Sequence, residues 1–508
     1  MIYKEEMKLN VQVCIVGSGI GGGTVALKLA EQGISFVIVE AGGTAPRKTN
    51  VKVDNVGRPF GLRTTAAIQL GGTSNLWHGV LAPLDKNDFE QREWIPNSGW
   101  PISLSDLKPF YRESSEILGI KDYDFFNPEK LSKELMVNLN DMKFNRRILK
   151  NKLFQQPLPP KNFKHDLLEL VKKSKDFHLY MDTTALEFDI GPCNNVKRLI
   201  CGLEDGETFE VTANTYVVCA GALETPRLLL NSKVDNVNLG KYLMDHPMTS
   251  LCQIEPKNTQ KTHIYSAVKY RTDVAIKTGF ELKCEEQISR KVPNHTFFMR
   301  PSFRRGINNA VEKVKLSLLT FKDGGVSFKD IFKVLSSIDI IFQVLLYKFS
   351  LSTNYKYMDL FFVTEQVPLA ENKVSLSHVV DKWGYPISQV NWEMSQLDID
   401  FMAEWYKVLT RECLADYYLT AEFSPFDWKN SYTSAAHHLG TARMNTVKET
   451  GVIDKNLKVF DVNNLYVCDG SVFTTSGNVN PGLTISAFSC RLVKYLTDKK
   501  ILKGRHSD

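Results

Sequence analysis

The chain has 508 residues, which is too long for one hydrophobic core, and its 43% hydrophobic and 24% charged residues are those of an ordinary globular protein. Lysine and arginine total 63 against 57 acidic residues, and so mild an excess argues against nucleic-acid binding. The 9 cysteines are never spaced as CxxC, which argues against a disulfide scaffold and a zinc site, and we expect no metal. No apolar run reaches the length of a membrane span and the first residues lack a signal core, so a cytoplasmic protein is expected.

Residues 11–40 predict a strand, a helix and a second strand. The glycine pattern GxGxxG lies between the first strand and the helix. Gly17 permits the tight turn, Gly19 lets the backbone approach a pyrophosphate, and Gly22 allows the helix to pack closely on the strand. Glu40 ends the second strand, where a carboxylate can accept the ribose hydroxyls of an adenosine. The unit predicts a dinucleotide site rather than a glycine-rich turn without a ligand, but it does not separate FAD from NAD.

Between about residues 253 and 430, short strand-like runs lie among lysine-rich turns, which indicates a mixed sheet. After residue 464 the pattern changes to a strand, a loop rich in glycine and proline, and a helix. Ile485, Phe488 and Leu492 fall on one face of that helix, which is therefore expected to pack in a core. We expect both ends of the chain to return to the same domain.

A series of motifs after residue 70 separates the two cofactors. It runs through GGTSNLW at 71–77, AGALETP at 220–226, DHP at 245–247, HHLGTARM at 437–444, NLYVCDGS at 464–471 and SGNVNP at 476–481. In this order, behind the N-terminal unit, the series resembles the glucose–methanol–choline (GMC) oxidoreductases, which bind FAD. The resemblance covers roughly the first 115 residues, the stretch from about 180 to 250, and the last 75.

The resemblance implies an α/β fold class, with a discontinuous Rossmann-like FAD-binding domain built from both chain ends and a mixed-sheet α+β substrate-binding domain. The expected parts are the first FAD-binding segment at 1–115, a connecting or substrate-side segment at 116–174, the second FAD-binding segment at 175–252, the substrate-binding domain at 253–430, and the C-terminal FAD-binding segment with the catalytic pair at 431–508.

The resemblance also implies which residues surround the FAD. The GGTSNLW loop is similar to the segment along the pyrophosphate and under the flavin edge, where small residues and backbone N–H groups suit a close approach. Relatives with a covalently attached flavin carry histidine in the place of Leu76, so we expect non-covalent FAD. The N–H groups after Pro481 are expected at the flavin's pyrimidine edge, because the positive end of a helix stabilises negative charge. Beyond Gly17, Gly19, Gly22 and Glu40, the expected cofactor-binding residues are Gly72, Thr73, Ser74, Asn75, Ala185, Asp469, Gly470, Pro481 and Thr484.

Two residues of the C-terminal motifs match the family's catalytic positions. Hydride leaves an alcohol carbon more readily when the hydroxyl proton leaves with it, so the site needs a base. His437 stands at the catalytic histidine and is expected to be that base, whereas His438 is expected to point elsewhere. Asn480 matches the second position, where an amide holds the alcohol oxygen without competing for its proton. Outside this motif series a histidine pair is more often structural, and Asn480 can also cap the helix after Pro481.

The resemblance therefore implies an FAD-dependent oxidoreductase that converts an alcohol to a carbonyl by hydride transfer to flavin N5. Trp77 and the pair Glu365-Gln366 resemble features of sugar-oxidising members, which favours a sugar or polyol. The expected partners are a small-molecule alcohol and an electron acceptor, which is oxygen, a quinone or a redox protein, so that oxidase and dehydrogenase stay equally open. The motif at 245–247 is interpreted as a structural loop under the cofactor.

Three other functions stay open. An NAD-dependent dehydrogenase accounts for residues 11–40 and for nothing after them. A flavin lyase without net oxidation is the second, since the family contains such a branch. The third is a membrane-associated, catalytically inactive flavoprotein, because residues 328–349 have a broad apolar face with lysines beside it. A buried helix or a lid over the active site is the other interpretation of that segment.

Overall fold

The computed structural model describes residues 11–46, 53–58, 66–136, 145–256, 261–262, 268–270, 273–303, 353–414, 418–420 and 428–503, with the single positions 332, 336, 338, 342 and 345. Most of the segment 328–349 lies outside these residues, so the expectation of membrane contact there stays a prediction. Over the described part of the chain, no helix combines the length and the apolar character needed to cross a membrane.

A parallel sheet joins the two ends of the chain. Its strand order is β21-β9-β1-β2-β5, and each neighbouring pair runs parallel. The strands are β1 (Val11–Val16), β2 (Phe36–Val39), β5 (Phe177–Tyr180), β9 (Ala213–Val218) and β21 (Leu465–Val467). They are nearly continuous apolar runs because helices and loops bury both faces of such a sheet. The expected Rossmann-like fold from both chain ends is confirmed.

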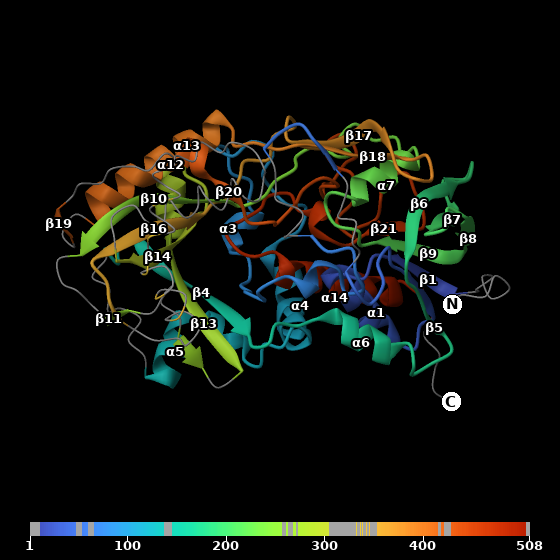
Figure 1. The fold of residues 1–508 in the computed structure, drawn as a ribbon, viewed down its shortest axis with the longest axis horizontal. Coiled ribbons are helices and arrows are strands. Elements are labelled where there is room, and N and C mark those ends of the chain that lie inside the picture. The colour runs from blue at the N-terminus through green and yellow to red at the C-terminus, as the bar shows by residue number, and fades with distance from the viewer. Residues whose placement is uncertain are drawn as a thin grey trace.

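Two helices from opposite ends of the chain pack against each other beside this sheet. Helix α1 (Ile20–Glu31) contacts α14 (Gly482–Asp498), which also contacts α4 (Leu104–Ile117) (Figure 1). A Cβ atom on Gly21 of α1 would lie 2.2 Å from the Cys468 carbonyl oxygen, so only glycine lets this helix approach the end of β21. The close approach brings the N-termini of α1 and α14 to the same edge of the sheet.

A large antiparallel sheet forms the second half of the molecule. Its order is β12-β13-β14-β16-β10-β19, with β4 paired to β13 and β20 paired to β10. The strands are β4 (Leu149–Pro157), β10 (Pro247–Pro256), β12 (Val268–Tyr270), β13 (Val274–Leu282), β14 (Thr296–Ser302), β16 (Tyr357–Val363), β19 (Tyr418–Thr420) and β20 (Thr433–Ser434). Helix α12 (Gln396–Val408) covers one face, where Phe297, Phe362 and Trp405 form an aromatic core.

Smaller elements complete the fold. Strand β18 (Pro386–Asn391) pairs antiparallel with β17 (Lys373–Val380) and parallel with β3 (Val53–Asn55). An antiparallel unit contains β6 (Thr183–Ile190), β7 (Val196–Leu203) and β8 (Thr208–Val211), and β11 (Lys261–Thr262) pairs with β15 (Thr353–Asn354). The short helices are α3 (Lys86–Phe89), α5 (Pro128–Leu135), α6 (Phe163–Leu170), α7 (Thr225–Asn231), α8 (Cys284–Arg290) and α13 (Trp428–Ser431), with 3-10 turns at Gly72–Asn75, Tyr123–Phe126 and Gly470–Val472 and a π-turn at Leu409–Cys413.

Candidate active site

The glycine loop after β1 leaves open space at the start of α1. Gly17 has φ +94°, and a Cβ on Gly22 would lie 1.9 Å from the Gly17 carbonyl oxygen, so both positions require glycine. A Cβ on Gly19 would meet no heavy atom within 4 Å, and the same holds at Gly221. Backbone N–H groups and the positive end of α1 therefore border a space that suits a phosphate group.

Glu40 ties this loop to the neighbouring segments. One of its carboxylate oxygens accepts hydrogen bonds from the Ser18 N–H at 3.0 Å and the Ser18 hydroxyl at 2.5 Å, and the other accepts from the Gly42 N–H at 2.8 Å. The Ser18 hydroxyl oxygen in turn accepts from the Gly71 N–H at 2.8 Å. The Glu40 carbonyl accepts from the Thr183 N–H at the start of β6, the strand that carries Ala185.

The segment 72–75 forms a 3-10 turn against the glycine loop. A Cβ on Gly72 would lie 3.0 Å from the Cα of Gly19, so the two predicted cofactor segments touch. Ser74 donates its hydroxyl to the Gly71 carbonyl, and Asn75 donates its amide to the Gly72 carbonyl at 2.7 Å. Thr73 is exposed, as is Leu76, whose exposed fraction is 45%.

Asp469 joins the C-terminal motif to the segment 220–226. Its carboxylate accepts hydrogen bonds from the Gly221 N–H at 2.8 Å, the Thr225 hydroxyl at 2.6 Å, and the N–H and hydroxyl of Ser471. Burial raises the pKa of Asp469, and these hydrogen bonds oppose that rise. Because four protein groups donate to this buried carboxylate, Asp469 holds the segment 220–226 against the C-terminal motif. The Gly221 backbone borders the open space described above.

His437 and Asn480 lie side by side. The Nε2 atom of His437 is 3.1 Å from the side-chain nitrogen of Asn480, and both residues are half-buried. Burial lowers the pKa of His437 to about 3, with a smaller contribution from His246 and an opposing one from Asp245. The imidazole is therefore neutral near pH 7. Its Nδ1 atom is buried and has no hydrogen-bond partner among the described residues.

His438 points to a different neighbour. Its Nε2 atom lies 4.0 Å from a carboxylate oxygen of Asp245. Burial lowers the pKa of His438, and Asp245 opposes that shift. A Cβ on Gly470 would lie 2.6 Å from the His438 carbonyl oxygen, so the predicted cofactor residue Gly470 contacts the backbone of the histidine pair.

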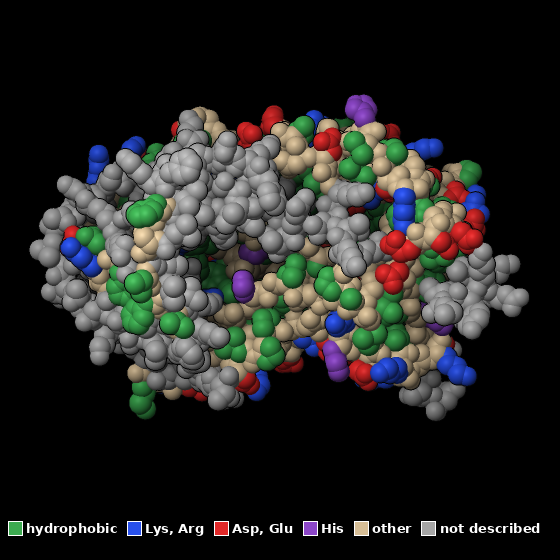
Figure 2. Space-filling model, viewed as in Figure 1, with side chains coloured by type: hydrophobic (Ala, Val, Ile, Leu, Met, Phe, Trp, Pro, Cys, Tyr) green, Lys and Arg blue, Asp and Glu red, His purple; other side chains and the backbone are tan. Residues whose placement is uncertain are grey.

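Helix α14 begins at Gly482, two residues after Asn480. Pro481 occupies the N-cap position, and Ile485 donates the first backbone hydrogen bond of the helix, to the Pro481 carbonyl. The preceding N–H groups, up to that of Thr484, therefore lack partners within the helix and give this end its positive character. The Thr484 hydroxyl lies 3.0 Å from the Tyr111 hydroxyl. Histidine side chains are visible in a hollow near the middle of the molecular face in Figure 2.

The motif at 245–247 contacts His437, and the sequence alone did not connect it with the predicted catalytic pair. The Asp245 carboxylate accepts a hydrogen bond from the His437 backbone N–H at 3.1 Å. The rings of His246 and His437 meet edge to face, with centroids 5.3 Å apart. The sequence offered one signal for this contact, a short motif of hydrogen-bonding residues without another assigned role. Only the tertiary fold shows that the motif supports His437.

The side chains that suggested a sugar substrate form hydrogen bonds or ion pairs with other residues of the protein. Glu365 forms a two-point ion pair with Arg92 at 2.7 and 2.5 Å, and both side chains are 1% exposed. The Gln366 side-chain oxygen accepts from the Asp245 N–H and from the Trp392 indole. Trp77 donates its indole N–H to the Lys161 carbonyl at 2.7 Å. These contacts leave the preference for a sugar without support from the site.

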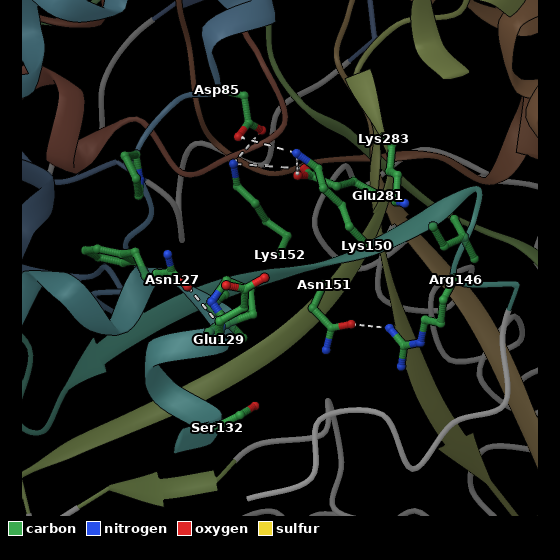
Figure 3. A pocket seen from close by; sticks show the side chains of 15 residues that line it. Asp85, Asn127, Glu129, Ser132, Arg146, Lys150, Asn151, Lys152, Glu281 and Lys283 are labelled. Carbon is green, nitrogen blue, oxygen red and sulfur yellow. Dashed lines mark hydrogen bonds and ion pairs between the residues drawn. The ribbon is translucent and has the colours of Figure 1, made fainter. Parts of the chain in front are cut away.

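A separate pocket of about 680 Å³ lies along β4, β13 and α5. Figure 3 shows Asp85, Lys150, Lys152 and Glu281 close together at one end of it. Lys152 contacts Asp85 at 2.6 Å and Lys150 contacts Glu281 at 2.9 Å, so opposite charges neutralise each other there. None of the predicted site residues lines this pocket. In the described ranges, no group of three His, Cys, Asp or Glu residues is arranged to hold a metal ion.

Known proteins resemble this chain along most of its length. Two family models, both described as GMC oxidoreductase, match residues 196–248 and 368–489. A 2-methyl-1,2-propanediol dehydrogenase of Mycolicibacterium austroafricanum is 25% identical over 96% of this chain and 95% of that protein. A long-chain-alcohol oxidase of Arabidopsis thaliana is 22% identical over 97% of this chain and 68% of that protein. The solved structure of an FAD-dependent oxidoreductase from Chaetomium thermophilum superposes with a TM-score of 0.58 at 14% identity, covering 97% of this chain and all of that one, which is a likeness of fold.

Proposed function

We propose, because the chain belongs to the GMC oxidoreductase family, that it is an FAD-dependent enzyme that oxidises the CH–OH group of an alcohol to a carbonyl. The observation that carries this proposal is the contact of 3.1 Å between His437 and Asn480 at the start of α14. A base and an amide on one small surface are the groups that an alcohol hydroxyl needs.

FAD is the cofactor that we propose for the space beside the glycine loops. The open positions next to Gly19 and Gly221 would admit a pyrophosphate, and Glu40, which is hydrogen-bonded to the glycine loop, is the residue that we propose to meet the ribose. The contact between Gly72 and Gly19 supports a shared cofactor surface, and a structure of the same fold is named an FAD-dependent oxidoreductase. Bound FAD would supply the hydride acceptor.

Non-covalent attachment is part of the proposal. Leu76 is exposed and aliphatic, so it has no nucleophilic atom with which to form a bond to a flavin. We expect heat or acid to release free FAD into the supernatant. Flavin that stays with the precipitated polypeptide would contradict this expectation.

His437 and Asn480 have different proposed roles toward the alcohol. The imidazole of His437 is neutral near pH 7, so it has a nitrogen lone pair that can accept the hydroxyl proton. Asn480 holds the alcohol oxygen through its amide. The partially positive N-terminus of α14 favours negative charge that develops beside the pair.

A small alcohol with neighbouring hydroxyls is the substrate class that we propose. The relative named a propanediol dehydrogenase supports it, and the relative named a long-chain-alcohol oxidase supports alcohols more broadly. Because dehydrogenases and oxidases both occur among these names, oxygen, a quinone and a redox protein all stay as proposed acceptors.

One experiment tests the function and its rivals together. Diols, polyols, sugars and simple primary alcohols are added anaerobically to the purified holoprotein, and flavin absorbance near 450 nm is followed before and after air is admitted. Bleaching by alcohols supports the proposal, and the speed of reoxidation separates oxidase from dehydrogenase. A protein without flavin would favour the NAD-dependent alternative, and flavin that no alcohol bleaches would favour the lyase or an inactive protein.

A further inference from the structure

Ala436, directly before His437, has a strained backbone. Its φ is +59°, in the left-handed region that alanine rarely adopts because its Cβ crowds the following carbonyl oxygen. Strain of this kind persists only where surrounding contacts hold the chain in place. The contacts around this turn therefore decide where the His437 side chain points.

One buried carboxylate supplies most of those contacts. Asp245 accepts a hydrogen bond from the His437 N–H at 3.1 Å, and its other oxygen accepts from the Ser434 hydroxyl. The Ser434 oxygen in turn accepts from the Ala436 N–H at 2.8 Å. The carboxylate thus reaches the strained turn from both sides of Ala436.

The segment that carries Asp245 is itself held on two sides. Met244 forms both backbone hydrogen bonds of an antiparallel bridge with Leu439, at 2.9 Å each. On the other side, the Asp245 N–H donates to the Gln366 side chain at 2.9 Å, and His246 Nδ1 lies 3.0 Å from the Thr364 carbonyl. Asp245 is fully buried, so these contacts operate away from water.

We propose that Asp245 is a positioning residue for His437: it holds the left-handed turn at Ala436 and so aims the imidazole at Asn480, while the His246 ring packs edge to face against it. The assignment gives the motif at 245–247 a role in catalysis rather than in the general support of the cofactor loop. It makes the geometry of the catalytic pair depend on a residue that touches neither alcohol nor cofactor.

The test is whether glycine at position 436, which adopts the left-handed turn without strain, restores activity when the Asp245 carboxylate is removed. Asp245→Ala should slow flavin reduction at saturating alcohol by about 10- to 100-fold, the usual cost of a misplaced catalytic group, with little change in KM. In the double variant with Ala436→Gly the rate should recover by roughly tenfold, because glycine adopts the left-handed conformation without the penalty that alanine carries. Wild type and the single Ala436→Gly variant are measured alongside.

Lys291 offers a matched control. It also has a left-handed φ, +54°, at the exposed C-terminal end of α8, far along the chain from the site. In wild type and in Asp245→Ala, Lys291→Gly should raise the thermal unfolding midpoint as Ala436→Gly does. It should leave the slow flavin reduction of Asp245→Ala unchanged. Rescue by Ala436→Gly alone supports the proposal. Equal rescue by both glycines, or rescue by neither, overturns it.

Two further measurements keep the test decisive. If Asp245→Ala does not fold or retain FAD, Ser434→Ala replaces it, since that change removes the contact that links Ala436 to the carboxylate. Because the role rests on the proposed function, His437→Ala is measured first. If His437→Ala leaves flavin reduction unchanged, the proposed function fails. If His437→Ala is slow but neither Asp245→Ala nor Ser434→Ala is, only the positioning role fails.

Discussion

At the residue scale, two adjacent histidines differ in what they touch. His437 meets Asn480 through Nε2, whereas His438 lies nearest the carboxylate of Asp245. His437→Ala should therefore slow flavin reduction by roughly two to four orders of magnitude, the usual contribution of a placed general base. His438→Ala serves as the control and should cost far less. Asn480→Ala should fall between the two, because the base remains. Anaerobic stopped-flow measurement at saturating alcohol gives the order, and a slower His438→Ala variant would reverse the assignment.

Buried neutral histidines also predict how stability depends on pH. Burial lowers the pKa of His295 and of His437 to about 3, well below the value of about 6.5 in an unfolded chain. Between these values the unfolded chain binds more protons, so the free energy of unfolding should fall as pH drops below about 6.5. Their contribution is fully present above that pH and is lost progressively toward pH 3.

His295→Gln tests this prediction in isolation. His295 is buried, stacks on Trp405 with ring centroids 5.4 Å apart, and accepts the Glu365 N–H at 3.0 Å. Urea unfolding of the holoprotein at pH 7.5 and pH 5 should show a smaller loss of stability in the variant than in wild type. An equal or larger loss in the variant would mean that this imidazole does not stay neutral in the folded protein.

At the element scale, two glycines of one loop should fail in different ways. A Cβ on Gly22 would clash with the Gly17 carbonyl oxygen, whereas a Cβ on Gly19 would enter open space. Gly22→Ala should therefore destabilise the packing of α1 on β1, seen as a lower unfolding midpoint even without added FAD. Gly19→Ala should fold normally and bind FAD at least about tenfold more weakly, because its methyl group would occupy space proposed for the pyrophosphate. Calorimetric titration with FAD and thermal unfolding separate the two, and normal FAD affinity in Gly19→Ala would contradict the proposed cofactor position.

Local patterns predicted the elements whose signals are complete within a short stretch. The glycine loop, α1 and β2 follow from residues 11–40, and α14 follows from the apolar face after Pro481. The pairing of β4 with β13 was not predictable, because nothing local in 149–157 identifies a partner more than a hundred residues away. The contact of Asp245 with His437 was not predictable for the same reason, because it joins residues 192 positions apart that lie beside the paired strands β10 and β20. The domain boundaries and the roles of the site residues stay predictions.

At the scale of the whole molecule, buried polar contacts connect α3 with α8 and with the loop that leads from α8 into the antiparallel sheet. Asn87 donates to Gln287 at 2.9 Å, and Asn294 donates to Asp88 at 2.9 Å. On the same side, the Asn478 amide, in the loop before the predicted catalytic residue Asn480, donates to Glu281 on β13 at 2.5 Å. The loop that carries the predicted catalytic residue Asn480 is thus anchored to the antiparallel sheet.

The buried ion pair between Arg92 and Glu365 joins the segment after α3 to the segment after β16. It makes two hydrogen bonds, and Glu365 also accepts the Asn294 N–H at 2.8 Å. Replacing one partner leaves the other charge buried without compensation, so Arg92→Met or Glu365→Leu should each lower the free energy of unfolding by about 3–5 kcal/mol. The double variant should recover most of that loss, because an apolar pair of similar volume avoids the desolvation of two charges. Chemical denaturation of the four proteins at one pH measures the coupling. Additive losses in the double variant would mean that the two side chains act separately, and that the halves of the molecule are held together by their other contacts.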